Sequence, residues 1–130
     1  MYRVGGLIIR DKRLLLVSDS ETNVLWTPGG RLDEHESPRD ALTRELNEEL
    51  CLTNPDLKFY HTCEGTHINK PGEKVVMGYY LVFTDQTPQI SSEISVMKWV
   101  SRAELLDGTV RVVDEVALQI LPKLIEDDLL

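Results

Sequence analysis

The feature that most constrains this chain is the stretch 30–52, GRLDEHESPRDALTRELNEELCL, whose second half predicts an α-helix. Ser37 is a typical N-cap residue, and Pro38 suits the first helical position because its missing N–H costs no hydrogen bond there. Apolar residues then recur every four positions, which gives the predicted helix one apolar face. These residues are Leu42, Leu46 and Leu50. The stretch therefore predicts an amphipathic helix packed on the core.

Three glutamates project from one strip of this helix, because about 100° per residue places Glu45, Glu48 and Glu49 within one arc. Like charges at these spacings destabilise a helix, and so does their position near its C-terminal end. A glutamate-rich helix is more often a solvated face, but a sequence that breaks its local rules often does so for a site. Clustered carboxylates are the ligands that Mg²⁺ or Mn²⁺ prefers. Arg44 is expected to orient these carboxylates and keep them ionised.

The spacing resembles the signature of the Nudix hydrolase family, G-x5-E-x7-R-E-U-x-E-E-x-G-U, in which U is a bulky aliphatic residue. The matching positions are Gly30, Glu36, Arg44, Glu45, Leu46, Glu48, Glu49 and Leu52. Matches at all of them would arise by chance on the order of once in 10⁸ start positions. Cys51 stands where the signature has its second glycine, and a side chain there costs about 1 kcal/mol if φ is positive. We therefore expect an altered turn or lower stability at Cys51, without loss of chemistry.

The resemblance implies an α/β fold, the Nudix α/β/α sandwich with a mixed β-sheet between helices, and a single domain over residues 1–130. The same resemblance implies that Glu48 and Glu49 are the principal metal ligands and that Glu45 is a ligand or the general base. It makes Glu36 a supporting acid and Arg44 an orienting residue.

Two further metal ligands are implied outside the helix. Gly29, just before the signature, would contribute its backbone carbonyl. Glu93 precedes a predicted strand that ends Lys98-Trp99-Val100, a segment similar to the one that returns an acid to the metal site in Nudix relatives. An exposed loop glutamate is the equal alternative for Glu93. The general base stays open between Glu45 and Glu93.

The implied reaction is Mg²⁺-dependent or Mn²⁺-dependent hydrolysis of the pyrophosphate linkage in a nucleoside diphosphate derivative. The compact length favours a MutT-like nucleoside triphosphate pyrophosphohydrolase. An ADP-ribose or nucleotide-sugar pyrophosphatase is the alternative, although Pro71 is explained by a turn and is only loosely like the proline of ADP-ribose enzymes. Two alternatives belong to other functional classes. One is a regulatory Nudix domain that binds a nucleotide without turnover, and the other is a module that binds a basic partner through the acidic face.

The composition excludes several other classes. With 130 residues and a net charge of −8, the chain suits one domain that repels long nucleic acid and accepts a small nucleotide with a metal. No apolar run approaches the roughly 18 residues of a membrane span, and the N-terminus has no signal-peptide pattern, so we expect a cytoplasmic protein. Cys51 and Cys63 are expected to be free thiols, the three histidines lack metal-ligand spacing, and a homodimer is compatible with the sequence.

The rest of the chain predicts strands and one more helix. The segments 2–9 and 13–17 read as one hairpin, 57–67 and 74–84 as an antiparallel hairpin, and 111–124 as an amphipathic helix that Pro122 kinks or frays. Trp26, in a short strand before the double glycine, is expected in the core, and contact with a substrate base is the alternative.

Overall fold

The computed structural model describes residues 1–19, 24–66 and 72–130. Pro71, with the turn predicted there, and His67, one of the three histidines, therefore fall outside the described residues.

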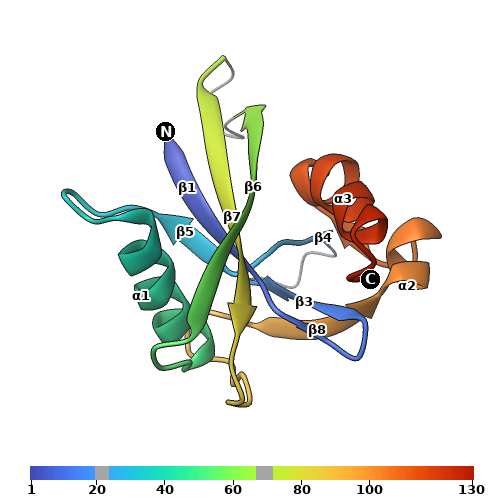
Figure 1. Cartoon of the computed structure of the whole chain (residues 1–130), viewed down its shortest axis with the longest axis horizontal. Coiled ribbons are helices and arrows are strands. Elements are labelled where there is room, and N and C mark those ends of the chain that lie inside the picture. The colour runs from blue at the N-terminus through green and yellow to red at the C-terminus, as the bar shows by residue number, and fades with distance from the viewer. Residues whose placement is uncertain (20–23, 67–71) are drawn as a thin grey trace.

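Strands form the centre of the molecule (Figure 1). A four-stranded sheet has the order β5–β1–β7–β6, in which β1 and β7 are parallel and the other neighbours are antiparallel. Its strands are β1 (Tyr2–Leu7), β5 (Gly29–Arg31), β6 (Asp56–Thr66) and β7 (Lys74–Phe83). An antiparallel three-stranded sheet consists of β2 (Ile9–Arg10), β3 (Arg13–Ser18) and β8 (Val96–Ser101). A short parallel pair joins β4 (Val24–Leu25) to β9 (Arg111–Val112).

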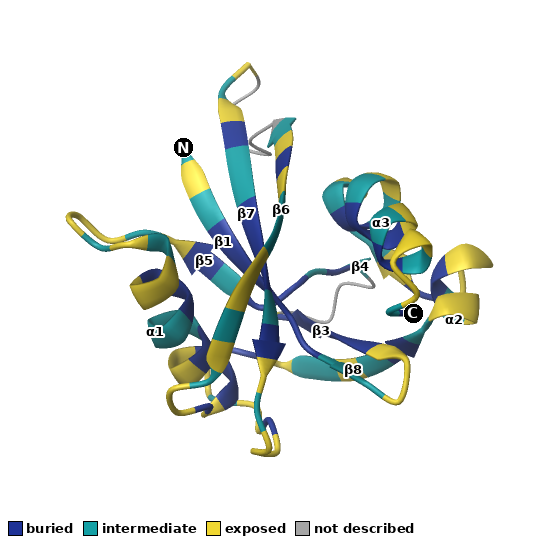
Figure 2. Ribbon diagram, viewed as in Figure 1, coloured by how far each residue is buried: buried dark blue, intermediate teal, exposed yellow. Residues whose placement is uncertain are grey.

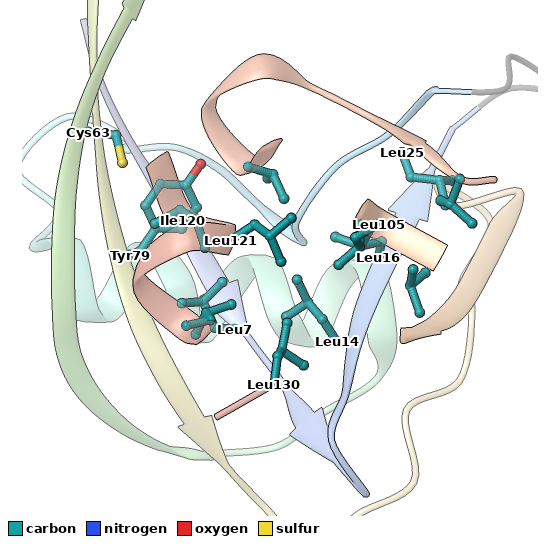
Figure 3. Close-up of a cluster of buried hydrophobic side chains, with 14 residues drawn as sticks. Leu7, Leu14, Leu16, Leu25, Cys63, Tyr79, Leu105, Ile120, Leu121 and Leu130 are labelled. Atoms are coloured by element: carbon teal, nitrogen blue, oxygen red, sulfur yellow. The ribbon is translucent and has the colours of Figure 1, made fainter. Parts of the chain in front are cut away.

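Helices cover the strands from two sides. In Figure 1, α1 (Pro38–Leu50) lies on the left, while α2 (Arg102–Leu106) and α3 (Leu121–Glu126) lie on the right. Figure 2 shows that the sides of the helices turned toward the strands are the buried ones. The buried leucines of α1 pack with residues of β1, β3 and β7, whereas the cluster in Figure 3 joins β1, β3 and β7 to α3. The predicted α/β class, with a mixed sheet between helices, is confirmed.

The two predicted hairpins have different outcomes. The second is confirmed, because β6 and β7 pair antiparallel along almost their whole length. The first is wrong as a single hairpin, because only Ile9–Arg10 turns back on β3, through Asp11 and Lys12 at positive φ. The chain changes sheet after Leu7, since residues 2–7 pair with β5 and β7 whereas Ile9–Arg10 pairs with β3.

The last helix begins later than its apolar pattern predicts. Residues 111–112 form β9 instead, and the helical turn η1 (Val116–Ile120) before α3 is a π-helix. Pro122 has no N–H to donate, which explains a departure from α-helical bonding in this turn. The sequence reasoning also missed α2, although its capping box was readable as Ser101-x-x-Glu104. Among the described residues, none of these helices combines the length and apolarity needed to cross a bilayer.

Both ends of α1 follow from local chemistry. The Ser37 hydroxyl accepts a hydrogen bond from the Asp40 N–H at 3.1 Å, which confirms the predicted N-cap. At the other end Cys51 has φ 58, and its N–H donates to the Asn47 carbonyl at 3.0 Å. The turn therefore keeps the left-handed conformation that glycine favours, and the expectation of an altered turn is wrong. The conformational cost falls on Cys51 itself.

Replacing Cys51 with glycine is expected to raise the free energy of unfolding by about 0.5–1 kcal/mol, because glycine adopts this φ without a Cβ clash. The Cys51 side chain is exposed, so its removal loses little packing. Urea denaturation checks the change. Cys51→Ala is the control, because alanine keeps the strained Cβ. Equal stability of the glycine and alanine variants contradicts the assigned strain.

Candidate active site

The acids of α1 reach the backbone of β5 because two consecutive glycines leave room for them. A Cβ built on Gly30 would lie 2.5 Å from Oε1 of Glu45, so any side chain at this position would displace that carboxylate. Gly29 has φ 148, and its N–H donates to Oε2 of Glu49 at 3.1 Å. The double glycine therefore places two carboxylates against one short strand. Metal binding by the Gly29 carbonyl stays a prediction.

Arg44 connects the signature acids to one another. Its Nε and Nη2 donate to the two oxygens of Glu36, both at 2.9 Å, which is a bidentate pair. Its Nη1 contacts Oε1 of Glu45 at 3.0 Å and Oε2 of Glu48 at 3.3 Å. Its Nη2 also donates to the Arg31 carbonyl at 3.1 Å, which ties α1 to β5. The geometry fits the predicted orienting role of Arg44.

The acids differ in pKa because they differ in hydrogen-bond partners and in burial. The hydrogen bond from Arg44 lowers the pKa of Glu36 to about 2. Burial raises the pKa of Glu49 to about 8 despite its bond from Gly29, and burial also raises the pKa of Glu45. The expectation that Arg44 keeps the carboxylates ionised therefore holds for Glu36 and is wrong for Glu49, which Arg44 does not contact in the part of the chain that the structure describes.

Without divalent cations, stability is expected to fall as the pH rises from about 4.5 to about 8. The folded protein holds a proton on Glu49 in this window that the unfolded chain has released. Stability is thus complete below the unfolded pKa and declines by up to about 1.4 kcal/mol per pH unit for one proton. Melting temperatures measured in EDTA, for wild type and Glu49→Gln, check this. The variant is expected to show a flatter pH profile, and an equal slope in both proteins contradicts the assignment.

Glu93 approaches the same group of acids through the loop before β8. The loop is fastened to the end of α1, because the Gln89 and Ser91 N–H groups donate to the carbonyls of Leu50 and Glu49 at 2.9 and 3.1 Å. The charge of Glu93 contributes to the raised pKa of Glu49, which places the two in electrostatic range. Glu93 is exposed, so it lies at the solvent side of the site.

The donor set suits a hard divalent cation, although the side chains are not arranged around one. Among the described residues, no three His, Cys, Asp or Glu side chains form a ready metal cluster. Arg44 holds Glu48 and Glu45, while Gly29 holds Glu49. Glu45 and Glu49 nevertheless lie together in a poorly solvated setting, where the charge of Glu45 contributes to the raised pKa of Glu49. A divalent cation with oxygen preference would relieve that repulsion.

An open cleft of about 580 Å³ lies beside these acids. Its lining includes Gly29, Gly30, Glu45 and Glu49. The sequence reasoning missed two further lining residues, Arg3 and Arg31. The position of Arg31 directly after the double glycine was a readable signal, whereas nothing local marks Arg3.

Trp26 and the two cysteines do not line the cleft. Trp26 is half-buried against the cluster of α1, in accord with a core role. Both cysteines are free, with Cys51 exposed and Cys63 buried.

Comparisons with known proteins agree with this fold. The family model of the NUDIX domain matches residues 1–121. The structure of a MutT protein from Methanosarcina mazei is similar, with a TM-score of 0.79, 22% identity and coverage of 98% of this chain and 94% of that one. A MutT NUDIX hydrolase from Burkholderia pseudomallei gives a TM-score of 0.65 and 26% identity over 79% and 85% of the two chains. The NUDIX domain of Shewanella oneidensis NrtR, complexed with ADP ribose, gives a TM-score of 0.75 and 22% identity. The match covers 98% of this chain and 87% of that one.

A curated relative is similar over a shorter part of the chain. It is a highly reducing polyketide synthase from Neurospora crassa, 34% identical over 68 residues. The match covers 50% of this chain and 3% of that protein. Together, the family model over residues 1–121, the shared fold and the arrangement of the acids around Arg44 show that this chain belongs to the Nudix hydrolase family.

Proposed function

We propose that this chain is a nucleoside triphosphate pyrophosphohydrolase that uses Mg²⁺ or Mn²⁺. The observation that carries the proposal is the pair of carboxylates, Glu45 and Glu49, that the double glycine admits against β5 beside an open cleft. Two carboxylates with raised pKa values at this position lower the stability of the fold. Binding of a metal ion together with a phosphate substrate explains why the protein keeps them there. Similarity to a MutT NUDIX hydrolase supports a hydrolase that acts on pyrophosphate linkages.

The metal ligands in this proposal are Glu45, Glu48, Glu49, the Gly29 carbonyl and Glu93. A divalent cation held there supplies positive charge to the phosphate oxygens and lowers the pKa of a bound water. Arg44 holds Glu36 in a bidentate pair and aligns Glu45 and Glu48. Glu45 or Glu93 accepts the proton of the attacking water, and the raised pKa of Glu45 places it nearer the working pH of a general base.

The wider setting belongs to the proposal as well. Residues 1–130 act as a single domain in the cytoplasm, on a small nucleotide, as a monomer or homodimer. The net charge of −8 argues against binding of long nucleic acid. An ADP-ribose or nucleotide-sugar pyrophosphatase is the second candidate, favoured by the ADP ribose bound to the similar NrtR domain.

Phosphate release from nucleoside triphosphates, ADP-ribose and nucleotide sugars tests the proposal, with a coupled pyrophosphatase and phosphatase to report both product types. Turnover of triphosphates with Mg²⁺ or Mn²⁺, and none with EDTA, is the expected result. Turnover confined to ADP-ribose or nucleotide sugars favours the second candidate. No turnover, with a nucleotide still raising the melting temperature, indicates a regulatory binding domain. Metal-independent binding of a basic protein that weakens with salt indicates an interaction module.

A further inference from the structure

Two arginines face each other across β1 and β5 in a way that the fold does not explain. Arg3 and Arg31 are direct partners in the antiparallel register, so their side chains leave the same face of the sheet. Directly opposed like charges destabilise a strand pair. Within residues 1–19, 24–66 and 72–130, no hydrogen bond or ion pair joins either guanidinium to another group. The pair therefore opposes folding without a compensating contact there.

In a second pair of opposed arginines, contacts with other groups compensate for the like-charge repulsion. Arg10 and Arg13 are also direct partners, between β2 and β3. The Arg10 guanidinium donates to the carbonyl of Thr84 at 2.9 Å and to that of Gln86, and it lies 5.7 Å from the ring centroid of Trp99. Arg10 therefore connects the segment that follows β7 with β8, and this role is structural. The pair of Arg3 and Arg31 has no comparable contacts among the described residues.

The position of the pair points to an anionic ligand. Arg3 and Arg31 line the same cleft as Glu45 and Glu49, and Gly29 and Gly30, which also line it, add no side chain between them. A guanidinium presents a fork of donors that matches phosphate oxygens. A phosphate on the arginines would relieve their mutual repulsion, while a neighbouring phosphate on the same molecule would meet the divalent cation proposed at the carboxylates.

We propose that Arg3 and Arg31 bind the terminal phosphate of a nucleoside triphosphate, beyond the linkage that is cleaved. The inference rests on the proposed function and narrows its substrate. A terminal phosphate carries close to two negative charges, which two guanidiniums match. Both phosphates of ADP-ribose are esterified and carry one charge each, so that substrate offers the pair no such group. The arginines thus select the triphosphate.

Steady-state kinetics of Arg3→Gln and Arg31→Gln test the selection. Each variant is expected to raise KM for a nucleoside triphosphate about 10-fold, with kcat changed less than about 3-fold, because a charge-assisted contact is lost in the bound state. Lysine at either position restores part of the loss, since it keeps the charge but not the fork. The melting temperature is expected to stay level or rise, because a like-charge pair is removed. A lower melting temperature with unchanged KM shows a structural role and overturns the proposal, and so does an equal KM increase for ADP-ribose.

Calorimetric titration with inorganic tripolyphosphate and Mg²⁺ gives a readout that needs no turnover. Both glutamine variants are expected to bind it about 10-fold more weakly than wild type. Arg13→Gln is the matched control, because it removes the same charge from an opposed pair on the other sheet and is expected to bind like wild type. Wild-type affinity in the Arg3 and Arg31 variants overturns the phosphate assignment. Absence of hydrolysis with any substrate would end the proposed function, while this titration still decides the role of the arginines.

Discussion

Glu49→Gln is expected to lower kcat for the preferred substrate by at least about 100-fold while the fold stays intact. Glu49 is nine-tenths buried, accepts the Gly29 N–H, and stands beside Glu45. Glutamine keeps the size and can still accept that bond, but it cannot supply the negative charge that a divalent cation requires. Because burial raises the pKa of Glu49 to about 8, the neutral amide resembles the protonated form of this side chain. Equal or higher stability than wild type in EDTA is therefore expected.

Two measurements separate lost chemistry from lost structure. Turnover is assayed over a range of Mg²⁺ and Mn²⁺ concentrations, and melting is followed with and without metal. Wild type is expected to gain melting temperature on metal addition, and Glu49→Gln to gain much less. Asp40→Asn, the same change of acid to amide at an exposed position of α1, is the control and should keep wild-type turnover. Wild-type rates in Glu49→Gln would remove Glu49 from the site.

Arg44→Met is expected to lower the free energy of unfolding by about 2–3 kcal/mol and to abolish most activity. The change leaves Glu36, which is 16% exposed, without its bidentate partner and releases the contacts of Glu45, Glu48 and the Arg31 carbonyl. Arg44→Lys is expected to recover only part of the stability, since an ammonium cannot pair with both oxygens of Glu36 in the same plane. Urea denaturation at neutral pH measures both variants.

The pH dependence of stability under acidic conditions provides a second test of the contacts made by Arg44. The folded pKa of Glu36 is depressed, so the stability from this contact is present above the ordinary value of 4.5 and is lost as the pH falls toward about 2. Arg44→Met is expected to lack that dependence. Arg39→Met is the matched control on the same helix, because Arg39 donates to the neutral Leu57 carbonyl at 2.7 Å and lies over Tyr80, contacts worth about 1 kcal/mol. A loss for Arg44→Met no larger than that for Arg39→Met contradicts the network.

The local features of the site were readable from the sequence because they depend on fixed chain spacings. The helical period alone puts Glu45, Glu48 and Glu49 on one strip, and the cap at Ser37 and the leucine repeat define the helix that carries them. The antiparallel pairing of β6 and β7 was predictable for the same reason, since a hairpin joins neighbours in the chain.

Tertiary structure decided what depends on contacts between distant residues. The sequence did not show that β1 pairs with β5 and β7, because that pairing joins segments that lie far apart in the chain. That pairing alone brings Arg3 opposite Arg31.

The charge states of the acids were also decided by the fold. Glu36 and Glu49 are the same residue type within one signature, yet one pKa is lowered to about 2 and the other raised to about 8. Spacing along the chain brings both acids to the site, but solvation and hydrogen-bond partners set their pKa values. The tertiary structure buries Glu49 beside Gly29 and pairs Glu36 with Arg44.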